Sequence, residues 1–461
     1  MSKKVLIANR GEIALRALRA CKELDLQTVA IHSSGDKELK HLRLADETVC
    51  VGPENPLESY LNIPAILSAA ELSGANAIYP GYGFLAEDPD FSERCEASGF
   101  IFIGPSSNVI RKMGDKITAK DLAEDSDIPT VPGYKGEMPD NDEDIKKIAK
   151  NVGYPLMIKA SAGGGGRGMR LINNIEAVEK NILEGKREAE NAFGNSEAFL
   201  ERYINNPRHV EVQILGDKKG NIYHLWERDC SIQRRNQKVI ERAPAPYLKD
   251  IQRQVVCEMA TKICEHVRYE CAGTVEFLMD IDTEEFFFIE VHPRIQVEHT
   301  ITEEVTGIDI VRAQIMLAEG YSIKEATGKE NQIDIECNGH ALQCRITTED
   351  PMNNFIPDYG RITAYRGATG MGIRLDGGTA YSGAIITRFY DSLLEKVTAW
   401  APTPENAISR MDRALREFRI RGVSTNISFV ENLLKNKAFL NNQYTTKFID
   451  NTPVSYTHLT L

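Results

Sequence analysis

Short apolar runs alternate with segments of helical spacing through the first hundred residues of the chain. Strands are predicted at 4–8, 28–32, 75–79 and 101–103, and helices at 11–24, 60–72 and 91–98. Strands that alternate with helices form a parallel sheet covered on both faces, and such sheets bind ligands at the carboxyl ends of their strands. The turns at 9–11 and 80–83 are therefore candidate ligand loops, although simple turn chemistry would also explain their glycines.

The rest of the chain divides into a small unit and two β-rich stretches. A linker rich in proline and glycine, 127–142, precedes helices at 142–151 and 175–192 and strands at 155–160, 169–172 and 198–201. Further strands are predicted at 209–215, 222–228, 273–280 and 286–291, with a helix at 250–266. A last β-rich stretch after 335 ends in helices near 404–418 and 426–434, and 454–461 continue no pattern. The fold class expected is a multidomain chain with α/β and α+β parts.

Charge and cysteine usage narrow the class of protein. The net charge is −12, which gives no bulk attraction for nucleic acid or an anionic membrane. The nine cysteines include no C-x-x-C pair, which favours reduced thiols. The start resembles no secretory signal, and no apolar run approaches the roughly 18 residues of a spanning helix. We expect a cytoplasmic enzyme or binding protein that contacts neither nucleic acid nor membrane.

A glycine-rich loop at 161–168 is the strongest local feature. It joins two predicted strands, so it fits neither the dinucleotide fingerprint nor a Walker A loop, both of which open a helix. Glycines without a Cβ let backbone N–H groups close on phosphate oxygens, and a lysine ends the strand that enters the loop. The alternative is a plain flexible hairpin. The candidate phosphate contacts are Lys159, Gly163, Gly164, Gly165 and Gly166.

Polar residues take every second position after an aromatic run at 286–288. In an extended chain, alternate side chains share one face. The wall predicted in this way consists of Glu290, His292, Arg294, Gln296 and Glu298. Glu276 lies on a preceding strand that would pair with this one, and two carboxylates on adjacent strands would make an oxygen-rich Mg²⁺ site. The alternative is an amphipathic strand with a solvated face.

Two weaker features accompany this wall. The cation-rich stretch 229–238 includes Gln233 and Lys238 and fits either a solvated loop or an anion site. His209, Glu211 and Gln213 alternate with apolar residues and form a further polar face.

Together and in this order, the clusters resemble the biotin carboxylase family of ATP-grasp enzymes from about Lys4 to about Asp450. The motifs that carry the resemblance are Val5–Ala14, Pro80–Leu85, the glycine loop and Arg294–His299. Residues 299–304, 379–384 and 411–419 are more similar to the pyruvate carboxylase branch than to the acetyl-CoA carboxylase branch. We expect an N-terminal α/β domain at 1–115, an ATP-grasp domain at 116–334 with a mobile lid at about 135–203, a C-terminal α+β domain at 335–450 and an unstructured tail at 451–461.

The resemblance implies carboxylation of biotin by bicarbonate and ATP through carboxyphosphate, the first half-reaction of a biotin-dependent carboxylase. The implied cofactors are ATP and Mg²⁺, with Mn²⁺ as a substitute, and biotin is a substrate carried elsewhere. The implied partners are a biotin carrier, a carboxyltransferase and a second copy of the chain in a homodimer. The chain contains no biotinylation sequence and no room for a carboxyltransferase domain, so we expect it to perform only this first half-reaction.

The resemblance also implies a role for each candidate residue. Lys116 and Lys159 would hold ATP phosphates under the glycines, Glu201 to Ile204 would meet adenine, and His209 and Gln233 would lie near the ribose. Glu276 and Glu290 would bind Mg²⁺, with His292 at a third ligand position. Lys238, Arg294, Gln296 and the backbone of Val297 would position bicarbonate. Glu298 would be the base, Arg345 would stabilise the biotin enolate, and Tyr82 would lie near the biotin ring.

Three positions depart from the family pattern. His292 replaces the usual asparagine, Asn236 the usual histidine, and Arg202 a common lysine. Imidazole is a poorer Mg²⁺ ligand than an oxygen donor. Two alternatives remain: an ATP-grasp ligase for another small molecule, and an ATP-binding scaffold whose catalysis is weakened by His292 and Asn236.

Overall fold

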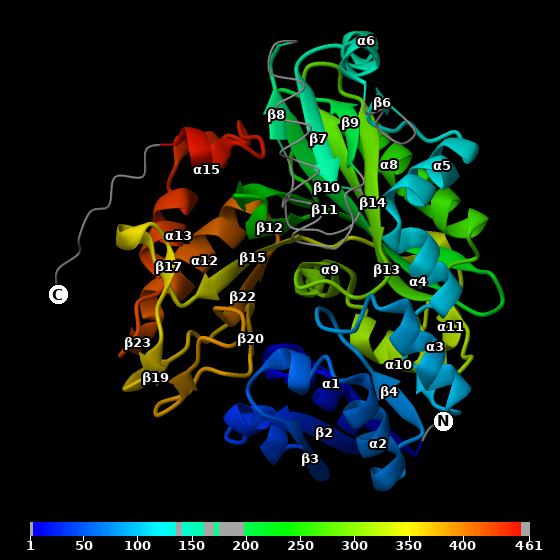
Figure 1. Cartoon of the computed structure of the whole chain (residues 1–461). Helices are drawn as coiled ribbons and strands as arrows, with labels where there is room; N and C mark the ends of the chain where they lie inside the picture. The colour runs from blue at the N-terminus through cyan, green and yellow to red at the C-terminus, as the bar shows by residue number, and fades with distance from the viewer. Residues whose placement is uncertain (1–2, 135–140, 161–169, 175–197, 453–461) are drawn as a thin grey trace.

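The computed structural model describes residues 3–134, 141–160, 170–174 and 198–452 (Figure 1). The glycine loop, the predicted helix at 175–192 and the residues after 452 lie outside these ranges. All nine cysteines lie inside them and are free thiols. Within the described ranges, no helix combines the length and the apolar character that a bilayer crossing requires.

A five-stranded parallel sheet forms the N-terminal part, shown in blue at the bottom of Figure 1. Its strand order is β3-β2-β1-β4-β5: Glu47–Gly52, Gln27–Ser33, Lys4–Ile7, Ala77–Tyr79 and Ile101–Phe102. Alternate residues of β1 belong to different cores, because Val5 packs with α1 (Gly11–Glu23) and Leu6 packs with α2 (Ile63–Ser73). The predicted doubly covered parallel sheet is therefore confirmed.

Helix and strand ends in this part follow local chemistry. The helix predicted at 60–72 begins only at Ile63, because the side chain of Asn62 caps it by accepting the Ala65 N–H at 3.1 Å. The third helix, α3, spans Pro89–Ala97 and is capped by Asp88. Strand β3 was missed because only one of its six residues is buried and its apolar signal is weak.

An eight-stranded antiparallel sheet runs through the middle of the molecule, in the order β14-β13-β10-β11-β12-β15-β22-β20. In chain order its strands are β10 Pro207–Gly216, β11 Ile222–Arg234, β12 Gln237–Ala243, β13 Cys271–Asp280, β14 Phe286–His292, β15 His340–Thr347, β20 Ile373–Gly377 and β22 Leu393–Ala401. The cation-rich stretch is thus the turn of the β11–β12 hairpin, where Arg235 and Asn236 have positive φ. The sheet is continuous across residue 335, where the C-terminal domain is expected to begin.

Strand β14 is an edge strand of this sheet, although most of its residues are apolar. The outer side of the strand is covered, because the Phe288 N–H donates to the Pro129 carbonyl at 2.8 Å. A covered edge can carry buried aromatic side chains without exposing them to another chain.

A small four-stranded sheet, at the top of Figure 1, has the order β6-β9-β7-β8. Its strands are Gly133–Tyr134, Ala198–Arg202, Leu156–Ala160 and Arg170–Ile172. Helix α6 (Asp142–Val152) packs Ile145 and Ala149 against it. Strands β7 and β8 are antiparallel neighbours, which confirms that the glycine loop joins two strands rather than a strand and a helix.

The other α-helices of the described residues lie against or beside the large sheet. They are α4 Ser107–Gly114, α5 Lys116–Asp125, α8 Asp250–His266, α9 His299–Thr306, α10 Ile310–Ala318, α11 Ile323–Thr327, α12 Pro404–Glu417, α13 Ile427–Leu434, α14 Lys437–Leu440 and α15 Phe448–Asn451. Short strand pairs complete the C-terminal part: β16 Glu349–Asp350 with β17 Ile356–Pro357, β18 Gly360–Arg361 with β21 Ile385–Ile386, and β19 Ala364–Arg366 with β23 Arg419–Arg421. The mixed α/β multidomain fold class is confirmed.

Candidate active site

A cavity of about 1380 Å³ lies where the N-terminal loops, the eight-stranded sheet, the four-stranded sheet and the C-terminal part meet. Most of the predicted site residues line it. They are Tyr82, Lys116, Glu201, Ile204, His209, Gln233, Lys238, Glu276, Glu290, His292, Arg294, Gln296, Val297, Glu298 and Arg345. The structure therefore brings together side chains that are up to about 260 positions apart in the sequence, counting from Tyr82 to Arg345.

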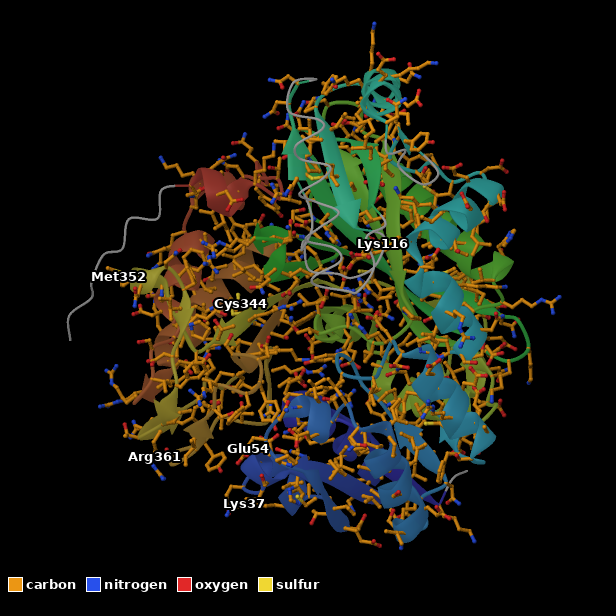
Figure 2. The ribbon with its side chains drawn as sticks, in the orientation of Figure 1. Lys37, Glu54, Lys116, Cys344, Met352 and Arg361 are labelled. Atoms are coloured by element: carbon orange, nitrogen blue, oxygen red, sulfur yellow. The ribbon has the colours of Figure 1, made fainter. Side chains whose placement is uncertain are left out.

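The remaining predicted residues belong to strand β7 and to the glycine loop that follows it in the sequence. Lys159 lies on β7, but its side chain is outside the described part, as are Gly163, Gly164, Gly165 and Gly166. Lys116 is described; it begins α5 and lies near the middle of the molecule in Figure 2, with its Nζ 3.6 Å from Glu290 Oε2.

Three side chains on β13 and β14 form a candidate metal site. Glu276 and Glu290 are direct partners in the strand register, as the predicted hairpin requires. Glu276, Glu290 and His292 each offer one ligand atom, and these atoms lie within 4.8 Å of one another. The donor set fits a divalent cation, with two hard carboxylates for Mg²⁺ and one imidazole that Mn²⁺ accepts more readily.

The imidazole of His292 has a raised pKa. Burial lowers its pKa, but the carboxylates of Glu276, 3.3 Å from Nε2, and of Glu87 together outweigh burial and raise the pKa to about 10. A proton on Nε2 and a metal ion would therefore compete for the same place between the carboxylates.

The extended wall predicted at 290–298 is wrong beyond His292. Strand β14 ends there, since Pro293 has no N–H to continue a ladder and the Arg294 N–H turns back to the His292 carbonyl at 2.8 Å. Glu298 then caps α9 with φ −83°. A turn and a helix start, rather than strand alternation, bring the polar side chains to the cavity.

Lys238 is the centre of a buried charge cluster. Its Nζ lies 2.5 Å from Glu211, 2.8 Å from Glu276 and 2.6 Å from Glu298, so all three ammonium donors are used. Burial lowers the pKa of Lys238, but the three carboxylates outweigh it and raise the pKa well above its usual value.

Glu298 lies between two cations. One carboxylate oxygen contacts Lys238, and the other accepts from Arg345 Nη2 at 2.9 Å. Burial raises its pKa, but Lys238 and Arg345 outweigh burial and leave the pKa below its ordinary value. The side chain is thus ionised, the form that a general base needs.

A second buried layer holds these side chains in place. Arg345 Nε lies 2.5 Å from Glu241, and Arg228, which is fully buried, lies 2.6 Å from Glu211. Gln296 donates to Glu276 at 3.0 Å and accepts from Arg228 at 2.9 Å. Sequence reasoning noted Glu211 on a polar face but gave it no role, and it missed Arg228 and Glu241.

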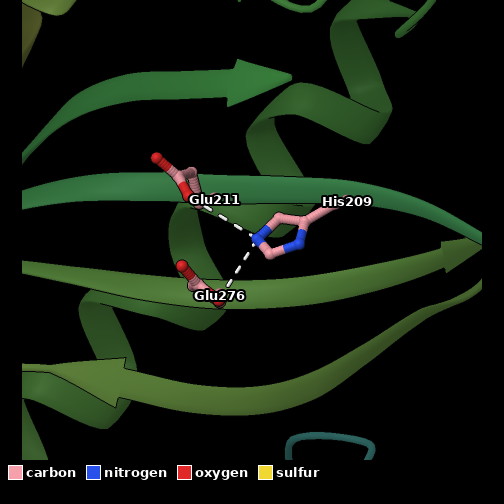
Figure 3. Close-up of side chains that lie close together, drawn as sticks. All are labelled: His209, Glu211 and Glu276. Carbon is pink, nitrogen blue, oxygen red and sulfur yellow. Dashed lines mark ion pairs between the residues drawn. The ribbon is translucent and has the colours of Figure 1, made fainter. Parts of the chain in front are cut away.

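His209 lies against the same carboxylates (Figure 3). Its Nε2 is 3.2 Å from Glu276 and 3.5 Å from Glu211, while Nδ1 contacts the Gln233 amide at 3.0 Å. Burial lowers its pKa, but the carboxylates of Glu276 and Glu211 together outweigh burial and raise the pKa to about 9. The pair His209 and Gln233 is therefore positioned as a unit at the edge of the charged cluster.

The apolar side of the cavity contains the segment predicted to meet adenine. Ile204 is buried with Val131 and Phe287, and Met157 and Leu278 also line the cavity. Glu201 on β9 forms an ion pair with Lys120 of α5. Apolar side chains beside a charged cluster can hold a base on one side and phosphates on the other.

Three parts of the chain meet at the backbone of Val297. Lys396 on β22 donates to the Val297 carbonyl at 3.0 Å and lies 3.0 Å from Glu12 on α1. Glu12 in turn accepts from the hydroxyl of Tyr82. The peptide of Val297 is thus fixed by the N- and C-terminal parts together.

Family models match the chain in three consecutive blocks. Residues 1–110 match the N-terminal domain of biotin carboxylase, and residues 343–451 match its C-terminal domain. Residues 115–326 match the ATP-binding domain of the carbamoyl-phosphate synthase L chain.

Similar proteins are of two lengths. A pyruvate carboxylase of Staphylococcus aureus is 52% identical over 98% of this chain, and the chain spans only 39% of that protein. A biotin carboxylase of Haemophilus influenzae is 48% identical over 95% of this chain and 96% of its own length. Among solved structures, the biotin carboxylase domain dimer of the 2-oxoglutarate carboxylase of Hydrogenobacter thermophilus, in complex with MgADP and bicarbonate, has a TM-score of 0.93 and 46% identity. That comparison covers 98% of this chain and 97% of the other.

Proposed function

The chain belongs to the biotin carboxylase family of ATP-dependent ligases, and we propose that its cavity carboxylates biotin by way of carboxyphosphate. The observation that carries the proposal is the ionised carboxylate of Glu298, held between Lys238 and Arg345 beside the Glu276–Glu290 pair. Such a carboxylate can take the proton of bicarbonate while cations face the developing phosphate charge.

The first step joins bicarbonate to the γ-phosphorus of ATP. An oxygen of bicarbonate attacks the phosphorus, the bond to the bridging oxygen breaks, ADP leaves, and the bicarbonate proton passes to Glu298. We assign Lys238, Arg294, Gln296 and the Val297 backbone to hold bicarbonate. ATP and Mg²⁺ are the cofactors; Glu276, Glu290 and His292 would hold the metal ion, which would supply charge neutralisation at the phosphates.

The nucleotide contacts are assigned on the same basis. Lys116 and Lys159 contact the phosphates together with Gly163, Gly164, Gly165 and Gly166. Glu201 and Ile204 face the adenine, and His209 and Gln233 lie toward the ribose. The apolar side chains of Met157, Ile204 and Leu278 support the adenine placement.

The second step transfers the carboxyl group to biotin. Carboxyphosphate breaks into CO₂ and phosphate, phosphate takes the proton of the biotin ureido nitrogen, and that nitrogen attacks CO₂. We assign Arg345 to stabilise the enolate form of biotin, with Tyr82 beside the ring. Glu241 supports this assignment, because it holds the guanidinium of Arg345 in the cavity.

We propose further that the chain acts as the first-half-reaction part of a pyruvate carboxylase. Its 52% identity to the Staphylococcus aureus enzyme supports this, and the biotin carboxylase part of an acyl-CoA carboxylase is the alternative. A biotin carrier and a carboxyltransferase would then be its partners, and a homodimer its assembly. Detecting transfer from its carboxylated carrier to pyruvate, but not to acetyl-CoA, would support the first assignment.

The experiment that tests the function follows ADP release with and without free biotin and bicarbonate. We expect turnover that requires bicarbonate and rises with biotin under Mg²⁺ or Mn²⁺. If ATP binds but biotin never stimulates turnover with either metal, the weakened ATP-binding scaffold suggested by His292 and Asn236 replaces this proposal.

A further inference from the structure

Glu87 makes a contact with the candidate metal site that the sequence did not suggest. Its Oε1 lies 3.0 Å from His292 Nδ1, on the ring side opposite the Glu276 and Glu290 oxygens. The same oxygen lies 3.1 Å from Arg294 Nε. One carboxylate of the N-terminal part thus contacts two residues on the metal and bicarbonate side of the cavity.

The loop that carries Glu87 is held firmly at both ends. It follows β4, and the amide of Asn9 donates to the Pro80 carbonyl at 2.7 Å and to the Tyr82 carbonyl at 2.8 Å. At the other end, the Asp88 side chain caps α3 by accepting the Phe91 N–H at 2.9 Å. Leu85 and Ala86 are buried between these points. Glu87 is therefore presented to His292 on a fixed backbone.

The contact determines which imidazole nitrogen faces the carboxylate pair. An ionised carboxylate can only accept, so Nδ1 must carry a hydrogen and donate it to Glu87. The nitrogen left for a metal is Nε2, 3.3 Å from Glu276 Oε1 and 3.8 Å from Glu290 Oε1. A carboxylate behind a ligating imidazole orients the ring and raises its basicity.

We propose that Glu87 is a positioning residue that makes His292 an Nε2 ligand of the metal site and shifts this site toward Mn²⁺. The proposal rests on the proposed function for the presence of a metal at Glu276 and Glu290. An asparagine at 292, the residue usual in the family, offers an amide oxygen and has no ring to orient, so the role of Glu87 depends on the histidine.

The test measures metal binding without turnover. Metal-free full-length protein, labelled with [¹⁵N]histidine, is titrated with Mn²⁺ in the presence of ADP, with neither bicarbonate nor biotin. Electron paramagnetic resonance gives the affinity from free Mn²⁺, and electron spin echo modulation reports a histidine nitrogen bound to Mn²⁺. We expect that modulation in the wild type and its loss in His292→Asn.

Variants of Glu87 separate positioning from charge. Glu87→Ala should weaken Mn²⁺ binding by roughly 10- to 100-fold, the usual effect of losing such a support, and weaken the nitrogen signal. Glu87→Gln keeps an oxygen acceptor for Nδ1–H and should retain the signal. Glu71→Ala removes an exposed carboxylate of the same domain and serves as the charge control.

The decisive comparison repeats Glu87→Ala in the His292→Asn background. If Glu87 acts through the imidazole, its removal there leaves the Mn²⁺ affinity unchanged. An equal loss in both backgrounds, or the absence of a histidine signal in the wild type, would overturn the proposal. The proposed function is judged separately by biotin-dependent ADP release, so either can fail without the other.

Discussion

At the scale of single residues, Glu298 is the side chain whose chemistry is easiest to isolate. Glu298→Gln keeps the shape and the oxygen contact but removes the group that accepts a proton. We expect bicarbonate-dependent turnover to fall by about 10²–10⁴. ADP release at saturating ATP measures the loss, and calorimetry should show ATP binding unchanged. Near-normal turnover would show that another group is the base.

His292 makes a prediction of its own. His292→Asn exchanges a nitrogen donor for an oxygen donor, which Mg²⁺ prefers more strongly than Mn²⁺ does. Turnover with Mg²⁺ should therefore rise relative to turnover with Mn²⁺. The measurement is the ratio of the two rates in both proteins, and an unchanged ratio would mean that the imidazole does not contact the metal.

Some residues of this site could be predicted from the sequence, and others could not. Side chains within motifs, such as Lys238, Glu290 and Arg345, were predicted and do line the cavity. Glu87, Arg228 and Glu241 were missed, because each matters through a partner on another element. Nothing in their own neighbourhoods marks them, since an Arg228–Glu211 pair exists only after β10 and β11 have aligned.

At the scale of helices and strands, periodicity predicted the buried elements and failed at their ends. Four of the five parallel strands and the β13–β14 hairpin were found, because they carry continuous apolar runs. The strand predicted from alternating polar residues was extended too far past Pro293, because polar residues in a turn can show the same two-residue period as a strand. β12 was missed because its polar side chains become buried only through ion pairs such as Glu241 with Arg345.

Strand β22 offers a test of stability against pH. Glu395 on this strand is 5% exposed and accepts from the hydroxyl of Tyr365 on β19. Burial raises its pKa to about 7, so the folded state binds a proton that the unfolded state releases at lower pH. Its contribution to stability therefore falls as the pH rises from about 4.5 to about 7.

Glu395→Gln should remove that dependence, because the amide is neutral throughout. The difference in free energy of unfolding between the variant and the wild type should shift by about 2–3 kcal/mol in favour of the variant from pH 5 to pH 8, as the pKa shift implies. Thermal unfolding at both values measures the difference. An equal offset at the two pH values would mean that Glu395 is ionised in the folded protein.

At the scale of the whole molecule, Lys396 joins three parts of the chain. It is fully buried and contacts Glu12 of α1 and the Val297 carbonyl. Lys396→Met should lower the free energy of unfolding by about 3–5 kcal/mol, because it leaves the buried carboxylate of Glu12 without its cation. The loss should also raise the KM for bicarbonate, since Val297 loses its anchor.

The double variant Lys396→Met with Glu12→Gln provides the control. Removing both charges should recover most of the stability but not the KM, because the carbonyl stays unanchored. Urea unfolding and initial rates measure the two effects. If the single variant is as stable as wild type, the bridge between the parts contributes nothing to folding.

The large sheet has a consequence for recombination between homologous enzymes. A crossover near residue 335 would divide β12 from β15, whose backbones pair from Ile240 with Cys344 to Ala243 with Ala341. A β15 from another enzyme could still pair through its backbone. Its arginine at position 345, however, would face a Glu241 that evolved with a different partner. A crossover at 203–206, between β9 and β10, would leave the sheet and the ion pairs among its own strands intact. Viable chimeras should therefore inherit Glu298, Lys238 and Arg345 as one block.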